Sequence, residues 1–183
     1  MARMSAVETL ICDTLIEMME TQPVDRIKVT ELVKIAGISR SAFYVYFDSV
    51  YAVLQLLEDT FISGLPDEDD ISSGRITESD IYDGFKYVRD NLKMYRTLCG
   101  PYGDSTFQAR LANRTKRVFE KYILSHPSQK TLAEKSMIAE CIAASQWAVC
   151  KWWAFNEGEV STAEVHRFLR SRTKILIDSL GSG

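Results

Sequence analysis

Several features that mark secreted, membrane or metal-binding proteins are missing from this sequence. The N-terminus lacks the basic segment and uninterrupted apolar stretch that a secretory signal peptide requires. The longest apolar run, residues 141–150, is interrupted by Ser145 and Gln146, whereas a membrane span needs about 20 predominantly apolar residues. The four cysteines show no CxxC spacing, so we expect buried, reduced thiols. These absences predict a cytoplasmic protein that does not cross a membrane.

The motifs of common catalytic sites are missing as well. The sequence has no nucleophile elbow, no glycine-rich phosphate loop, no HExxH motif and no recognisable pair of catalytic carboxylates. It has only two histidines, His126 in an expected turn and His166 on an expected helix. We therefore expect a protein that is not an enzyme and that holds no cofactor or metal ion.

Proline and glycine are scarce, with four and nine residues in a chain of 183, which favours helices. Apolar residues recur at three- and four-residue spacing along most of the chain, and this period predicts an all-α fold. Residues 63–76 are rich in glycine, serine and acids, so we expect a mobile loop there, with an acidic interaction segment as the alternative. The remaining helices are expected at 3–21, 49–62, 77–91, 91–98, 105–125 and 129–156, and from a last cap at Ser161.

The sequence also marks where several of these helices begin and which faces they bury. Thr77 is an expected cap, and Thr131 with Glu134 and Ser161 with Glu164 match the capping-box pattern. Residues 138–155 are apolar nearly all round their helix, so we expect contacts on more than one side. The last helix is expected to carry one narrow seam formed by Val165, Phe168, Leu169, Arg172, Ile175, Leu176, Ser179 and Leu180.

Residues 28–47 predict two short helices joined by a tight turn. Thr30 is placed to cap the first helix, and Gly37 ends it, because glycine takes a positive φ without steric cost. Ser39 can then cap a second helix that begins at Arg40. The expected apolar face of the first helix contains Leu32, Val33, Ile35 and Ala36, and that of the second contains Ala42, Phe43 and Phe47.

This arrangement is the helix-turn-helix unit, whose second helix enters the major groove of DNA. Two helices joined by a glycine turn also occur in all-α proteins that never touch DNA. The pattern alone therefore leaves both possibilities open.

The same stretch resembles the N-terminal domain of the tetracycline-repressor (TetR) family of transcriptional regulators. That family shows a threonine at the start of its second helix, an Ala-Gly-Val-Ser turn and an ending of tyrosine, any residue, aromatic or histidine, and phenylalanine. Here the corresponding residues are Thr30, the turn Ala36-Gly37-Ile38-Ser39 and the ending Tyr44-Val45-Tyr46-Phe47. The resemblance covers about the first 60 residues, and beyond them it extends only to length and helical layout.

The resemblance implies a three-helix DNA-binding domain at residues 1–48, a connecting helix at 49–62 and a helical ligand-binding and dimerisation domain at 77–183. It implies a dimeric repressor that binds a palindromic DNA operator and responds to a small-molecule effector. The two C-terminal helices carry excess apolar surface, which suggests that they form the homodimer interface. The alternative is a helical adaptor or co-activator of the same fold that binds a protein partner and has lost DNA reading.

Carried over residue by residue, the resemblance also implies a set of DNA contacts. Arg40 is the expected base reader, because a guanidinium can make two hydrogen bonds to guanine. Thr30 and Ser39 are expected to act on phosphate through hydroxyls and helix N-termini, and Lys28 is added from its charge and position. The complete set is Lys28, Thr30, Ser39, Arg40, Ser41, Tyr44 and Tyr46.

The C-terminal domain of the family encloses a ligand cavity. Aromatic residues and methionine at helical spacing are the candidates to line it, although such residues also serve as ordinary core. The candidates are Tyr87, Met94, Tyr95, Phe107, Leu111, Tyr122, Trp147 and Trp152.

The sequence carries little positive charge for a DNA-binding protein, since phosphate contacts normally use lysine and arginine. The net charge is −3. The first 50 residues carry five basic residues (Arg3, Arg26, Lys28, Lys34, Arg40) and seven acidic ones. The family usually places a phosphate-contacting lysine in the first turn of the connecting helix, where this chain has Val50. That departure removes one expected contact.

Overall fold

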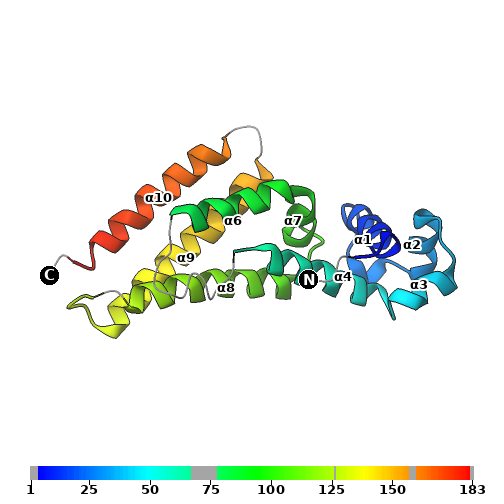
Figure 1. Ribbon diagram of the computed structural model, residues 1–183, viewed down its shortest axis with the longest axis horizontal. Helices are drawn as coiled ribbons and strands as arrows, with labels where there is room; N and C mark the ends of the chain where they lie inside the picture. Colours follow the sequence, from blue (N-terminus) through cyan, green and yellow to red (C-terminus); the bar gives the residue numbers. More distant parts are fainter. Residues whose placement is uncertain (1–3, 67–77, 126, 157–159, 182–183) are drawn as a thin grey trace. The chain divides into compact units, whose positions relative to one another are not determined.

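The structure is a computed structural model that describes residues 4–66, 78–125, 127–156 and 160–181. Within these ranges all regular secondary structure is helical (Figure 1), which confirms the predicted all-α fold class. None of the described helices is long and apolar enough to span a membrane. The α-helices are α1 (Ala6–Met19), α2 (Val29–Ala36), α3 (Arg40–Tyr46), α4 (Val50–Gly64), α6 (Glu78–Asp90), α7 (Leu92–Cys99), α8 (Ser105–Ser125), α9 (Leu132–Phe155) and α10 (Thr162–Asp178), with a 3-10 turn at Val24–Arg26.

The helix boundaries agree with the sequence prediction to within a few residues, because local capping groups mark most of them. The predicted capping boxes are both present, at Thr131 with Glu134 and at Ser161 with Glu164. Hydrogen bonds from the backbone N–H and hydroxyl of Thr131 hold the pKa of Glu134 below its ordinary 4.5. The predicted loop lies outside the described residues from 67 onward, as does the expected cap at Thr77.

The chain divides into two compact units. Unit 1 comprises Met1–Ile62 and Lys93–Phe107, and unit 2 comprises Ser63–Leu92 and Gln108–Gly183. Figure 1 shows α1, α2 and α3 gathered together in unit 1, in blue to cyan. Unit 1 also contains most of α7 and the start of α8, although these segments lie within the C-terminal domain expected at residues 77–183.

Phe61 of α4 connects the later helices to the core of unit 1. Its ring centroid lies 5.7 Å from that of Tyr95 on α7 and 6.0 Å from that of Phe107 on α8. All three side chains are buried. The Lys93 ammonium adds ion pairs at 3.7 Å and 3.5 Å to Glu17 and Glu20 of α1. Unit 1 is therefore larger than the helix-turn-helix and its neighbouring helices in sequence.

The core of unit 2 is formed where α8, α9 and α10 meet. Phe119 and Ile123 of α8 pack with Ile142 of α9 and with Leu180, which follows α10. A buried hydrogen bond from the Gln146 amide to the Thr173 hydroxyl, at 3.1 Å, links α9 to α10. Both helices also contact α6, and the rings of Phe85 and Trp153 meet edge to face at 6.1 Å there.

The turn between α2 and α3 has the predicted geometry. Gly37 takes a left-handed backbone conformation with φ of 68°, and the Ile38 N–H donates to the Val33 carbonyl at 3.1 Å. The hydroxyl of Ser39 accepts a hydrogen bond from the Ala42 N–H at 3.0 Å, which caps α3 as expected.

Three local expectations are wrong. Thr30 does not cap α2: the helix already begins at Val29, its N-cap is Lys28 and no side chain supplies the cap hydrogen bond. Ile35 is 59% exposed, because Leu32, Val33 and Ala36 lie within 100° of one another on a helix and Ile35 lies outside that face. Cys141 is exposed on α9, whereas Cys12 and Cys99 are buried as expected. Burial raises the pKa of the Cys12 thiol to about 12.

The conformation of Gly37 generates a stability prediction. We expect Gly37→Ala to lower the free energy of unfolding by roughly 1–2 kcal/mol, because an L-residue is strained at this φ. A Cβ at Gly37 would meet no atom within 4 Å, so the effect would come from the backbone alone. Gly37→Asn should cost less, since asparagine tolerates the left-handed region. Urea denaturation measures the change.

Gly84 provides a matched control, because it lies inside α6 and a Cβ there would also meet no atom within 4 Å. Gly84→Ala should raise the free energy of unfolding by about 0.5–1 kcal/mol, since alanine is the better helix former. If Gly37→Ala left the free energy of unfolding unchanged, or if both variants changed it with the same sign, backbone strain at Gly37 would be ruled out as the cause.

Candidate nucleic-acid interface

Two buried aromatic rings fix the rotation of α3 about its own axis. Phe43 is fully buried and Phe47, which follows the helix, is 6% exposed, with their ring centroids 5.9 Å apart. Both were expected in the core, and the structure confirms this. Because residues on a helix are separated by 100°, burial of Phe43 leaves the opposite face of α3 pointing outward. The exposed residues of α3 are Arg40, Ser41, Tyr44, Val45 and Tyr46.

All seven residues that the sequence indicated as DNA contacts lie on the surface of unit 1. Lys28 and Thr30 are exposed at the start of α2, and the other five are exposed at the start of α3 or along it. Tyr44 is 46% exposed and Tyr46 is 41% exposed. Their common position at the surface is a geometric condition for contact with a ligand, and DNA contact by each residue stays a prediction.

Local contacts organise the outward face of α3. The guanidinium carbon of Arg40 lies 5.7 Å from the ring centroid of Tyr44, one helical turn away, in a cation–π arrangement. The ring of Tyr44 in turn packs edge to face against the buried ring of Phe43, with the centroids 5.4 Å apart. The hydroxyl oxygens of Ser39 and Ser41 lie 2.9 Å apart in a hydrogen bond. The face therefore presents a supported cation, a phenol and hydroxyl groups to solvent.

Val50 occupies the position where a lysine was expected by resemblance. Its side chain is 5% exposed and belongs to the core, so this position of α4 offers no polar group. The next residue, Tyr51, is 57% exposed. Tyr51 and Val45 were not assigned a role from the sequence. The helical period, counted from the buried residues Phe43 and Val50, was the signal that could have marked them as exposed.

The negative charge of unit 1 is partly compensated on the side of α1. Two of the seven acids in the first 50 residues, Glu17 and Glu20, are paired with Lys93. Lys93 lies outside these first 50 residues. Surface ion pairs of this kind contribute little to stability, but they reduce the charge that an approaching phosphate would meet.

The eight candidate cavity residues divide between the two units. In unit 1, Tyr95 and Phe107 are buried against Phe61 and Met94 is half-buried. The other five lie in unit 2: Leu111 is buried, Tyr87, Tyr122 and Trp147 are half-buried, and Trp152 is 48% exposed.

Two of the half-buried candidates in unit 2 have defined surroundings. Burial raises the pKa of the Tyr87 phenol. The Lys151 ammonium lies 6.0 Å from the ring centroid of Trp147 and donates to the Gln108 side-chain oxygen at 2.8 Å. Ligand binding by any of the eight candidates stays a prediction.

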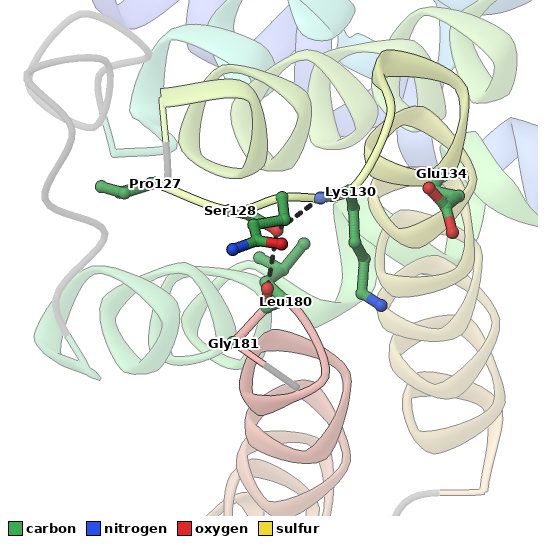
Figure 2. A pocket seen from close by; sticks show the side chains of 7 residues that line it. Pro127, Ser128, Lys130, Glu134, Leu180 and Gly181 are labelled. Atoms are coloured by element: carbon green, nitrogen blue, oxygen red, sulfur yellow. Dashed lines mark hydrogen bonds between the residues drawn. The ribbon is translucent and has the colours of Figure 1, made fainter. Parts of the chain in front are cut away.

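A surface hollow of about 690 Å³ is present elsewhere in unit 2. Figure 2 shows Ser128 at its centre, where the hydroxyl donates to the Leu180 carbonyl at 2.6 Å and accepts from the Lys130 N–H at 3.2 Å. The hollow is lined by Pro127, Ser128, Gln129, Lys130, Glu134, Leu180 and Gly181, none of which is a candidate cavity residue.

Comparison with known proteins places both the sequence and the fold. The TetR-type family described as "Transcriptional regulator C-terminal region" matches residues 77–173, more than half of the chain. The solved structure of "Dihydroxyacetone kinase operon activator DhaS" is similar with a TM-score of 0.63, at 17% identity over 96% of both chains. A TetR transcriptional regulator from Rhodococcus sp. RHA1 aligns with a TM-score of 0.44, at 14% identity over 96% of this chain and 97% of that one. No curated protein matches the sequence.

Proposed function

Because the chain belongs to the TetR family of transcriptional regulators, we propose that it is a dimeric repressor that binds a palindromic operator through α2 and α3. A small-molecule effector would release it by favouring a state in which the two α3 helices no longer match their half-sites. An effector can lower DNA affinity only by the amount to which it prefers that state.

One observation carries this proposal: the outward face of α3. With Phe43 buried and Ser39 capping the helix, Arg40, Ser41 and Tyr44 project from unit 1 together. Side chains on the outward face of a second helix are those that meet base edges in the major groove. Arg40 is the group suited to guanine, and the exposed hydroxyls of Ser41, Tyr44 and Tyr46 suit phosphate oxygens.

The outer surfaces of α9 and α10 support a dimer. On α9 an exposed stripe runs through Ala133, Met137, Cys141, Ala144, Ala148, Trp152 and Phe155, at spacings of three and four residues. The predicted apolar seam of α10 divides into two faces. Val165 and Leu169 pack inward, while Phe168 and Ile175 are 49% and 59% exposed. Pairing of these outer faces between two copies would bury apolar side chains that a single chain leaves in water.

The adaptor alternative draws on two observations. Val50 is part of the core where the family places a phosphate-contacting lysine, and acids outnumber bases in the first 50 residues. An adaptor of this kind would bind a protein partner and would have no preferred DNA sequence.

Selection from a random pool of DNA duplexes separates the two functions. A regulator should enrich a palindrome whose half-sites lie about one helical turn, or a multiple of it, apart. The enriched duplex should compete against bulk DNA at physiological salt. An adaptor would enrich no sequence, and that outcome would overturn the proposed function.

We expect Arg40→Ala to weaken binding to the enriched duplex by roughly 1–3 kcal/mol and to relax sequence preference at one position of each half-site. Fluorescence titration against a panel of single-base variants measures both effects. Lys28→Ala is the matched control, since it removes one exposed cation beside α2 instead of on α3. The control should weaken all duplexes alike and reduce the salt dependence, by a slope of about 1 for each phosphate that is no longer neutralised. Equal binding by wild type and Arg40→Ala would rule out Arg40 as a base reader.

Charge placed on the outer face of α10 should break the dimer. Ile175→Glu should shift the sedimentation velocity from dimer to monomer and weaken operator binding, because each half-site is then bound independently. Ile35→Glu is a close control, since Ile35 is also 59% exposed but lies on α2. It should leave the oligomeric state unchanged. A dimeric Ile175→Glu variant would exclude this face as the interface.

A further inference from the structure

We propose that Val45 reads the 5-methyl group of a thymine in each half-site and thereby fixes a T·A pair at that position. This inference rests on the proposed function, in which α3 lies in the major groove. It concerns a residue that the sequence did not indicate as a contact.

Val45 has the largest exposed fraction, 75%, among the exposed large apolar residues in the part of the chain that the structure describes. It is the sixth residue of the seven-residue helix α3. The buried residue Phe43 lies two positions earlier, which places the two side chains about 200° apart around the helix axis. Val45 therefore points away from the core that holds α3 in place.

The fold gives no reason for a valine here. A branched Cβ restricts χ1 and makes valine a poorer helix former than alanine, lysine or glutamate. With three quarters of its surface in water, the side chain gains little from packing within unit 1. The valine therefore costs some helical stability and gains little in return within the chain. A contact with a binding partner, which the isolated chain does not make, would explain its presence.

The neighbours of Val45 are the proposed base and phosphate contacts. Arg40, Ser41, Tyr44 and Val45 stand at positions i, i+1, i+4 and i+5, which together span about 140° of the helix surface. Arg40 is stacked over Tyr44, which forms one column of side chains. Ser41 and Val45, one turn apart, form the second column, because residues at i and i+4 are neighbours on a helix. A groove that receives Arg40 and Ser41 would also receive Val45.

The major groove contains one kind of methyl group that valine can contact. Its other base-edge groups are the N7, O6 and O4 acceptors and the N4 and N6 amino donors, whereas thymine adds a methyl group at C5. Val45 has no donor or acceptor, so placing it against a polar edge would remove water without replacing the lost hydrogen bonds. Contact with a thymine methyl buries apolar surface on both partners. The chemistry therefore points to T·A.

Deoxyuridine tests this directly, because it pairs like thymidine and lacks only the methyl group. Each T of the enriched palindrome is replaced by deoxyuridine in both half-sites, one position at a time, and affinity is measured for wild type and for Val45→Ala. For wild type we expect one position to lose about fourfold per half-site, or roughly 15-fold for the palindrome, from the transfer of one methyl-sized group. In Val45→Ala the same replacement should have little effect, and the two changes should be non-additive.

Two further measurements make the result specific. A C·G pair at the identified position should bind wild type more tightly when the cytosine carries a 5-methyl group, and this gain should disappear in Val45→Ala. Ile35→Ala, which removes exposed apolar surface from α2, should leave the deoxyuridine profile of wild type unchanged. Alanine is the better helix former, so Val45→Ala should retain the wild-type melting temperature.

The outcomes distinguish this inference from the proposed function. Enrichment of a palindrome with a deoxyuridine profile that is the same in wild type and Val45→Ala would overturn the inference alone. If Val45→Ala lost the same affinity for every duplex of the deoxyuridine series, the inference would also be overturned. That result would place Val45 against the DNA backbone instead of against one thymine methyl group. Failure to enrich any duplex would overturn the proposed function and the inference with it.

Discussion

The burial of Phe43 and Phe47 is the interaction on which the outward face of α3 depends. These two rings, 5.9 Å apart and nearly inaccessible to solvent, determine how α3 is rotated against unit 1. A rotation by one residue position would turn the outward face by 100° and change the set of side chains that it presents. The left-handed Gly37 and the Ser39 cap then set where the helix begins. The function proposed for this domain follows from that rotation, since it decides which side chains a groove would meet.

The surface that results is unusual in its chemistry. The outward face of α3 carries one cation, Arg40, together with hydroxyl groups and an exposed valine. The position where TetR proteins often have a lysine is part of the core. Under the proposed function, counterion release would contribute less to affinity than in a strongly basic domain. Base-edge contacts would then account for a larger share of the binding, which is why single side chains such as Arg40 and Val45 matter.

The C-terminal half shows how much apolar periodicity alone can predict. An apolar pattern nearly all round α9 predicted contacts on more than one side. In the structure one face of α9 is buried and the other is exposed. On α10 the single predicted seam separates into a packed face with Val165 and Leu169 and an exposed face with Phe168 and Ile175. The eight cavity candidates divide between two units because Tyr95 and Phe107 pack on Phe61 of α4. Spacing identifies apolar faces, but it does not identify the partner of each face.

The order of residues was sufficient to predict the helices, the turn at Gly37, the capping boxes and the burial of Phe43 and Phe47. These features arise from groups within about four residues of one another, so a local pattern of residues is enough to predict them. No sequence pattern predicted that Lys93 pairs with Glu17 and Glu20, or that residues 93–107 belong to unit 1. These outcomes depend on residues far apart in the chain, whose meeting is decided by the competition among all apolar faces for burial and not by any local pattern.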